Sequence, residues 1–208
     1  MKYSFGVGNL KDKDFKKIFE LDKRNYDKKY LISTEETKKR FNKNSNIYFS
    51  IRDIKERLVG YISVIPLKHK AYIRLKNGEI DKEVITIEDI ISPDEEITDL
   101  YFDSIIIDSK YRKGGLGRKF SFYVFEQLPK LYPEYKRILG NTVSEGGLKV
   151  LERRGLYKIE KENNSLIIVE KVIKNKSYVK IKNYKDKDKR IIERKREKLF
   201  NTNKMEIL

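Results

Sequence analysis

The chain has 208 residues, a formal net charge of +16 and no cysteine. Without cysteine it has no disulfide, no thiolate metal site and no cysteine nucleophile, and it suits a reducing compartment. No run of 18 apolar residues is present, and the opening Met1-Lys-Tyr-Ser-Phe lacks the apolar region of a signal peptide. We therefore expect a cytoplasmic protein that does not enter a membrane, with a core built from its 38% hydrophobic residues.

The positive charge has two explanations. A charge of this size concentrates polyanions around a protein, so nucleic acid and phosphorylated cofactors are candidate partners. Lys, Asn, Ile and Tyr are also jointly abundant, which is the excess expected from an A/T-rich coding sequence. The charge alone therefore assigns no partner.

The first part of the chain predicts a strand and two helices. Residues 3–7 form a short strand-like segment, and Phe15 and Ile18 follow with nearly helical spacing. Ser33-Thr-Glu-Glu is a capping box, which starts a second helix that runs to about Phe41.

Two strands and a long insertion come next. Residues 47–51 and 58–65 are apolar and flank a polar turn, which indicates an antiparallel hairpin. Residues 67–98 form an insertion in which Asn77-Gly78 predicts a tight hairpin turn. The apolar residues after that pair fit either a strand or a helix, namely Val84, Ile85, Ile87, Ile90 and Ile91.

The second half of the chain predicts a sheet interrupted by helices. Residues 99–108 form a strand with a continuous Ile105-Ile-Ile107 run, and a glycine-rich turn leads from it into a helix that ends at Pro133. The apolar face of that helix consists of Leu116, Phe120, Tyr123, Val124, Leu128 and Leu131.

The last predicted elements are one helix and three strands. Residues 137–143 form a strand, and Ser144 caps a short helix that Gly155 terminates. Two further strands follow at residues 156–159 and 166–172.

The sharpest feature of the sequence is Arg112-Lys113-Gly114-Gly115-Leu116-Gly117-Arg118, between an apolar strand and an amphipathic helix. Glycine permits positive φ and lets a ligand approach the backbone closely. The first N–H groups of a helix have no partner within it and carry partial positive charge, so such a junction binds phosphate well. An ordinary turn on a basic surface is the alternative, but the strand, the basic flanks and the helix together favour an anion site.

Two common phosphate-binding motifs do not match this turn. A Walker loop needs four residues between its glycines, followed by Gly-Lys-Ser/Thr. A dinucleotide fingerprint needs Gly-x-Gly-x-x-Gly near the start of a parallel βαβ unit, whereas this turn follows several strands that read as antiparallel.

A third pattern does match. Arg112-x-x-Gly115-x-Gly117, preceded by Tyr111 and by Ile105-x-Ile107, resembles the Arg/Gln-x-x-Gly-x-Gly/Ala signature of the GCN5-related N-acetyltransferases. The order of elements over residues 1–172 is similar as well, and Arg153-Arg-Gly155-Leu156 resembles that family's exit from a helix into a strand. The resemblance implies an α/β (α+β) fold with a central mixed, mainly antiparallel sheet flanked by helices.

The resemblance also implies acetyl-CoA as the co-substrate. The turn residues would hold its pyrophosphate through their backbone amides, namely Lys113, Gly114, Gly115, Leu116, Gly117 and Arg118. The backbone of Ile105, Ile106 and Ile107 would pair with the pantetheine arm between the splayed fourth and fifth strands, and an amide there would polarise the thioester carbonyl. The family's asparagine position falls on Ser144, and Asn141 just upstream is the alternative.

One position departs from the family. Its tyrosine, four residues before the terminal glycine, protonates the departing thiolate, and the same count back from Gly155 gives Leu151. Tyr157 and Tyr135 are nearby in sequence. Solvent is a further alternative, because a thiol pKa of about 8.5 makes the thiolate a tolerable leaving group.

A general base must take a proton from the attacking amine. Asp103 is the candidate, because it lies on the central strand and shares a face with Tyr101 and Ile105 by the two-residue period. A capping or ion-pairing role is its alternative. His69, the single histidine, we expect at the surface. No metal-binding cluster is visible, and this chemistry needs no metal.

Residues 173–208 differ from the acyltransferase segment of residues 1–172. From Lys171 onward the chain holds 14 Lys or Arg against 5 Asp or Glu. This basic segment is either a solvated tail or an electrostatic arm for a polyanion such as RNA.

Three functions stay open from the sequence. The first is an N-acetyltransferase, a monomer or homodimer, that acts on a primary amine of a small molecule, a protein or an aminoacyl-tRNA. The second is a nucleic-acid-binding protein that uses the basic segment. The third is an acyl-CoA-binding module without turnover, which Leu151 permits.

Overall fold

The computed structural model describes residues 3–79, 85–112, 114–142, 145–159 and 167–172, all within one compact unit of residues 1–174. Its strands are β1 (Tyr3–Val7), β2 (Tyr48–Asp53), β3 (Leu58–Leu67), β4 (Asp99–Ile107), β5 (Arg137–Thr142), β6 (Tyr157–Ile159) and β7 (Ile167–Val172). Its helices are α1 (Asp12–Lys23), α2 (Thr34–Lys43), α3 (His69–Lys76), α4 (Leu116–Leu131) and α5 (Glu145–Glu152).

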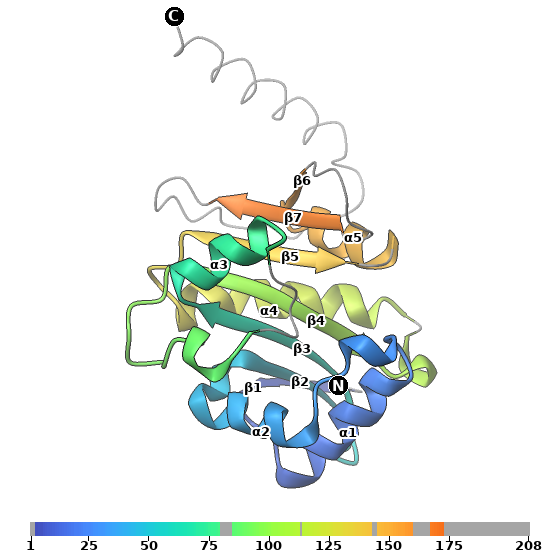
Figure 1. The fold of residues 1–208 in the computed structure, drawn as a ribbon. Helices are drawn as coiled ribbons and strands as arrows, with labels where there is room; N and C mark the ends of the chain where they lie inside the picture. The colour runs from blue at the N-terminus through green and yellow to red at the C-terminus, as the bar shows by residue number, and fades with distance from the viewer. Residues whose placement is uncertain (1–2, 80–84, 113, 143–144, 160–166, 173–208) are drawn as a thin grey trace, which may run out of the picture. The chain divides into compact units, whose positions relative to one another are not determined.

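The seven strands form one mixed sheet in the order β1-β2-β3-β4-β5-β7-β6 (Figure 1). Every neighbouring pair is antiparallel except β4 and β5, which are parallel. A parallel pair needs a crossover connection, and the chain makes it through α4. The mixed, mainly antiparallel sheet flanked by helices that the sequence predicts is confirmed.

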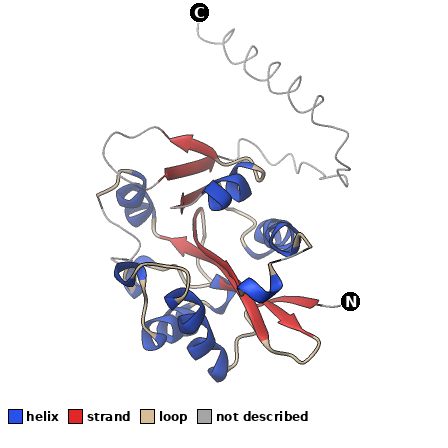
Figure 2. Ribbon diagram, turned by 90° about the vertical axis from the view of Figure 1, so that its right-hand side faces the viewer, coloured by secondary structure: helices blue, strands red, loops and turns tan. Residues whose placement is uncertain are grey.

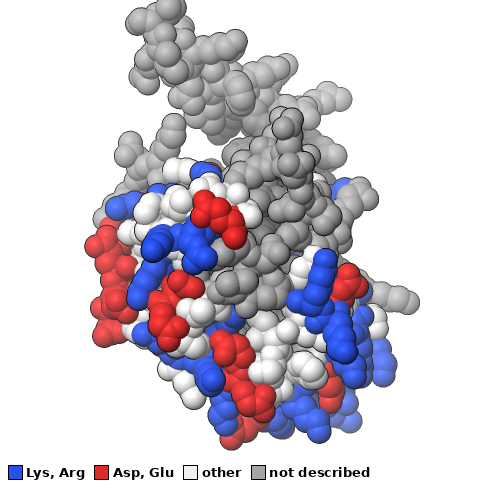
Figure 3. Space-filling model, in the orientation of Figure 1, with Lys and Arg blue, Asp and Glu red and all other residues white. Residues whose placement is uncertain are grey.

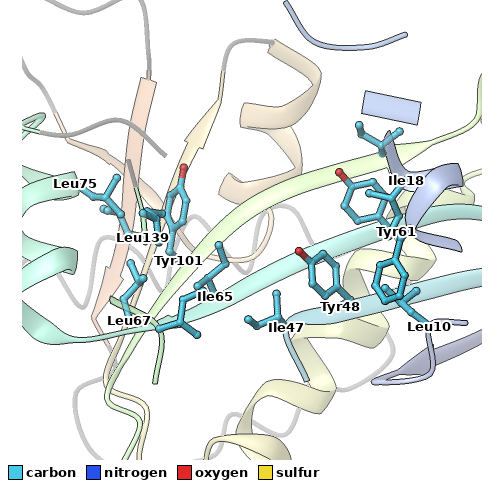
Figure 4. Packing of buried hydrophobic residues seen from close by; sticks show 14 of the residues in the cluster. Leu10, Ile18, Ile47, Tyr48, Tyr61, Ile65, Leu67, Leu75, Tyr101 and Leu139 are labelled. Carbon is cyan, nitrogen blue, oxygen red and sulfur yellow. The ribbon is translucent and has the colours of Figure 1, made fainter. Parts of the chain in front are cut away.

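Helices cover both faces of this sheet. Figure 2 shows α1, α2 and α3 on one side and α4 and α5 on the other. Because side chains alternate along a strand, each face buries its own cluster. The first cluster joins Ile18 of α1 to Tyr61 and Tyr101 of the sheet (Figure 4). The second joins Phe120 of α4 to Phe102 of β4.

Polar contacts fix how α1 and α2 begin and dock. The Ser33 hydroxyl accepts a hydrogen bond from the Glu36 N–H at 3.1 Å, so α2 starts at the predicted cap. Arg52 of β2 lies 2.6 Å from the Asp14 carboxylate of α1, and both side chains are only 3% exposed. A buried pair of this kind holds the helix in one place, because loss of either partner leaves an uncompensated charge.

The insertion between β3 and β4 corrects one sequence prediction. Asn77-Gly78 does not turn a hairpin but ends helix α3, with Gly78 at a φ of 66°. The Gly78 N–H bonds to the Leu75 carbonyl and the Glu79 N–H to the Arg74 carbonyl, which is a Schellman cap. Asn-Gly favours positive φ in either setting, and the preceding turn of helix decides between them.

The rest of the insertion is irregular. Residues 87–89 form a single 3₁₀ turn, and Ile90 makes one isolated bridge to Leu67 at the end of β3. Val84 lies outside the described residues. Helix α3 packs on the face of the sheet that α1 and α2 also cover, because Tyr72 and Leu75 belong to the same buried cluster as Tyr101.

The described surface carries both signs of charge. Figure 3 shows Lys and Arg interspersed with Asp and Glu on the face that bears α1, α2 and α3. None of the helices in the described part of the chain is long and apolar enough to cross a membrane.

Candidate functional site

Strands β4 and β5 separate part-way along their length. Their pairing runs from Asp99 opposite Arg137 to Phe102 opposite Gly140 and stops there among the described residues. Both strands continue, β4 as far as Ile107 and β5 as far as Thr142, where it stays paired with β7. The sheet therefore opens between its fourth and fifth strands, beside the Ile105–Ile107 segment where the sequence predicts an opening.

The backbone of β4 presents hydrogen-bonding groups to this opening. Hydrogen bonds between antiparallel strands alternate from residue to residue. The Asp108 N–H donates to the Val59 carbonyl at 2.9 Å, so Ile106 also bonds toward β3, while Ile105 and Ile107 direct their peptide groups toward β5. The Ile107 carbonyl bears this out, because it accepts from Arg112 rather than from β3.

The glycine turn follows directly after β4. Gly114 and Gly115 have φ values of 75° and 70°, a conformation that favours glycine. A Cβ on either residue would meet nothing within 4 Å, so open space lies in front of this backbone. The first described bond of the α4 ladder joins the Lys119 N–H to the Gly115 carbonyl, so the amides of residues 116–118 precede it and are available to an anion.

Arg112 fastens the turn to its surroundings. Its Nε donates to the Ile107 carbonyl at 2.8 Å, and its Nη2 donates to the side-chain oxygen of Asn25, just beyond α1. The sequence suggests Arg112 as added charge for a phosphate. The structure gives its guanidinium two protein acceptors, so the residue ties the turn to β4 and to the end of α1.

Asp103 lies at a β-bulge where the opening begins. The register between β3 and β4 shifts there, because Ser63 pairs with Ser104 while Val64 pairs with Phe102. The Ser63 hydroxyl donates to the Asp103 carboxylate at 2.8 Å. Bulges redirect side chains and are frequent beside functional sites.

The bulge corrects the sequence prediction that Tyr101, Asp103 and Ile105 share one face of the sheet. A regular two-residue period puts Asp103 on the same face as both Tyr101 and Ile105. Tyr101 packs in the cluster under α1 and α3, whereas Ile105 packs against the cluster under α4. The extra residue at the bulge shifts the alternation by one, so Ile105 lies on the opposite face from Tyr101.

The negative charge of Asp103 affects the pKa of two buried tyrosines. Burial is the main cause that raises the pKa of Tyr61 and of Tyr48, and the Asp103 carboxylate adds to both shifts. The Tyr61 hydroxyl donates to the Asp22 carboxylate on α1. Carboxylates and protonated phenols therefore lie together on the face of the sheet that α1 covers.

The predicted acid position is part of the core. Leu151 is only 2% exposed and packs in the cluster under α4, so no proton donor stands there. Burial raises the pKa of Tyr135 to about 12, which makes its hydroxyl a weak acid toward a thiolate. The side chains of Tyr157 and Asn141 lie outside the described ones, as do residues Lys113 and Ser144.

His69 belongs to a different place. It starts α3, its side chain is 56% exposed, and its Nδ1 lies 3.0 Å from the buried carboxylate of Asp99. Asp99 also pairs with Arg137 at 2.5 Å. These groups sit at the paired ends of β4 and β5, away from the opening, which agrees with the surface role expected of His69.

A cavity of about 500 Å³ lies elsewhere on the described surface, between residues 31–40 and residues 85–88. None of its lining residues belongs to β4 or to the glycine turn. We therefore do not assign it to the cofactor.

Sequence patterns did not mark several residues around the candidate site. Asp22 lies on α1, Asn25 follows α1 and Ser63 lies on β3, and each meets its partner across 39 to 87 residues of chain. No local pattern marks such contacts, because tertiary packing alone brings them together.

Comparisons with known proteins point to one fold. No family model and no curated protein matches the sequence. Solved structures do match, among them the loading GNATL domain of CurA from Lyngbya majuscula, with a TM-score of 0.60 and 13% identity over 83% of this chain and 98% of that one. The fold is that of the GCN5-related N-acetyltransferases (GNAT).

Two further GNAT-fold structures were solved with CoA or an analogue. The NatC complex bound to Gag peptide and CoA matches with a TM-score of 0.58 and 13% identity, over 84% of this chain and 100% of that one. Arabidopsis thaliana Naa50 with the bisubstrate analogue CoA-Ac-MVNAL matches with a TM-score of 0.55 and 11% identity, over 83% and 100%. The match spans nearly the whole of each of these chains.

Proposed function

We propose that this chain is an acetyl-CoA-dependent N-acetyltransferase that acts on a primary amine. One observation carries the proposal. The pairing of β4 with β5 ends before the glycine turn that starts α4, and the hydrogen bond from Arg112 to the Ile107 carbonyl joins this turn to the unpaired part of β4. A strand edge and a cluster of helix-terminal amides thus lie side by side. An extended amide-bearing arm that ends in a diphosphate is the kind of ligand that fits both.

The residues divide the binding of acetyl-CoA between them. The amides of residues 114–118 receive the pyrophosphate, because they lie at the positive end of the α4 dipole and open space lies in front of Gly114 and Gly115. The peptide groups of Ile105 and Ile107 pair with the pantetheine arm as an added strand would. Lys113, Asn141 and Ser144 remain assigned to this site from the sequence resemblance.

Asp103 serves as the general base of the reaction. It takes a proton from the acceptor ammonium, and the amine nitrogen then attacks the thioester carbonyl carbon. A new C–N bond forms, and a β4 amide stabilises the oxyanion. The nitrogen then loses its second proton to solvent as the C–S bond breaks, which leaves the amide and CoA thiolate. Solvent protonates the thiolate, because Leu151 occupies the position of the family's acid. Tyr157 is the alternative proton donor.

The acceptor is defined only as a primary amine. Similar structures include a spermidine N-acetyltransferase chimera and a ribosomal-protein-S18-alanine N-acetyltransferase, so one fold serves small and protein amines. We propose that this chain works in the cytoplasm, in line with its lack of cysteine. The basic residues 173–208 lie outside the described part of the chain.

Thiol release in the presence of an amine panel tests the proposal. The panel contains N-terminal peptides, lysine peptides, spermidine and aminoacyl-tRNA, and mass spectrometry follows the amines. We expect CoA release that depends on one class of amine and equals the amide formed. Tight acetyl-CoA binding without release for any class would instead favour a non-catalytic acyl-CoA-binding module, which Leu151 permits.

A further inference from the structure

The cavity of about 500 Å³ between α2 and the end of the insertion has both apolar and charged walls. Part of its lining is hydrocarbon from three half-buried side chains, Leu31, Ile32 and Ile87. Its charged lining residues are Glu36, Lys39 and Arg40 of α2 and Glu88 of the insertion. A lining of this kind suits a small ligand that joins a charged group to a hydrocarbon stretch.

Arg40 is the most deeply buried charged residue in this lining, with only 1% of its surface exposed. Its Nη2 donates to the Ile85 carbonyl at 2.9 Å, and its Nε lies 3.5 Å from the Glu36 carboxylate, which is long for a charge-assisted pair. Its Nη1 donates to none of the described residues. A buried charge is costly unless it is well paired, so Nη1 is the donor that Arg40 offers to an occupant of the cavity.

The unused polar groups of the cavity suit an anion. Lys39 is exposed and forms no ion pair with the described residues, so it adds a second cation beside Arg40. Glu36 already faces Arg40, and Glu88 accepts from its own N–H and from the Thr86 hydroxyl, which hold its pKa below the usual range. These two carboxylates would repel a doubly charged phosphate more than a singly charged carboxylate, so a carboxylate is the better match.

Tyr48 of β2 connects the cavity to Asp103. Burial is the main cause that raises the pKa of Tyr48, and the charges of Arg40 and Asp103 act on the same phenol with opposite signs. Tyr48 also pairs in register with Ser63, whose hydroxyl donates to Asp103. Ser63 is two residues after Tyr61, which packs under α1 together with Tyr48. The cavity and the Asp103 carboxylate therefore lie on the same side of the sheet.

We propose that the acceptor carries a carboxylate as well as its primary amine, and that Arg40 and Lys39 bind this carboxylate in the cavity. This inference rests on the proposed function, in which Asp103 takes a proton from the acceptor ammonium. The two charged groups stand at opposite ends of the acceptor, and the stretch between them packs on the apolar wall. Free ω-amino acids and short peptides with an acidic side chain near the N-terminus both have this chemistry.

Steady-state kinetics on the full chain, with saturating acetyl-CoA, compares matched acceptors. One series pairs ω-amino carboxylic acids of four to twelve carbons with the corresponding carboxamides, which keep the length but lose the charge. A second series pairs tripeptides that end in aspartate amide or asparagine amide. We expect kcat/KM to be about 10- to 100-fold higher for the carboxylate than for the carboxamide at the best length. The series with the larger ratio identifies the source of the acceptor.

Two neighbouring lysines of α2 provide matched variants. Lys39→Gln removes a cation that lines the cavity, and we expect it to lower the preference for the carboxylate several-fold. Lys38→Gln removes the same charge from a side chain that pairs with Asp12 and does not line the cavity, and we expect it to keep the preference. Arg40→Gln is expected to abolish the preference, and thermal unfolding shows whether this variant folds.

The outcomes separate this inference from the proposed function. Equal kcat/KM for carboxylate and carboxamide in both series overturns the carboxylate site and leaves the acetyltransferase proposal standing. An equal loss of preference in Lys38→Gln and Lys39→Gln shows a general charge effect and also overturns the site. If Arg40→Gln does not fold, the carboxamide comparison and the two lysine variants decide. Absence of transfer to every acceptor overturns both proposals.

Discussion

Gly117→Glu is expected to weaken acetyl-CoA binding by at least about 100-fold, or about 2.7 kcal/mol, without loss of stability. A Cβ at this position would meet only the Ile107 Cδ1 atom at 3.4 Å, which is ordinary contact. A carboxylate in the first turn of α4 interacts favourably with the helix dipole, so the fold tolerates it. The same carboxylate competes with the pyrophosphate for the turn amides and repels it.

Two variants at the same position separate shape from charge. Gly117→Gln has nearly the same shape as the glutamate without its charge, and is expected to bind acetyl-CoA more tightly than Gly117→Glu. Gly117→Ala is expected to stay within a few-fold of the wild type, since its methyl group has room beside Ile107. Calorimetry gives the affinities and thermal unfolding the stability. Wild-type affinity in Gly117→Glu would place the phosphate site elsewhere.

Gly115 makes a less informative test. Its φ of 70° strains any other residue, although a Cβ there meets nothing within 4 Å. A left-handed conformation costs a non-glycine residue roughly 1–2 kcal/mol. Lost binding in a Gly115 variant would therefore mix strain in the turn with blockage of the phosphate.

Asp103→Asn is expected to lower turnover on the order of 100-fold while acetyl-CoA affinity stays unchanged. Asparagine keeps the size of the side chain and its contact with Ser63 but cannot take a proton. Below the amine pKa, which is about 10.4 for a lysine-type acceptor, the free amine fraction rises tenfold per pH unit. The turnover rate of Asp103→Asn should rise with pH in proportion to the free amine. The wild-type rate should already reach its plateau at a lower pH.

Ser63→Ala is the matched control for Asp103. It removes the hydroxyl that donates to the carboxylate at 2.8 Å but leaves the base in place. We expect a small loss of turnover and a pH profile of wild-type shape. Steady-state kinetics from pH 6 to 10 compares the three proteins. Full turnover of Asp103→Asn across that range would exclude Asp103 as the base and point to an ordered water.

The sequence predicted the fold because most of its elements carry local signals. The apolar spacing of Phe15 and Ile18, the Ser33 cap and the Gly155 stop all lie within one turn of the element they define. The hairpin prediction at Asn77-Gly78 was wrong, because the preference of this pair for positive φ suits a helix end as well as a hairpin.

The candidate site could be predicted only where its parts are neighbours along the sequence. The glycine turn and the Ile105–Ile107 edge are local, and they lie side by side as expected. The bulge at Asp103 was missed, because an insertion in register depends on the partner strand. The contact of Arg112 with Asn25 was also missed, because the two residues meet only in the folded chain.

Amide hydrogen exchange, with and without saturating acetyl-CoA, tests most directly whether this chain holds the cofactor between β4 and the glycine turn. Backbone amides that gain a hydrogen-bond partner exchange more slowly. We predict slower exchange at Ile105, at Ile107 and across residues 114–118, with little change on β1 and β2. Unchanged exchange in those segments, or protection confined to the cavity between residues 31–40 and 85–88, would contradict it.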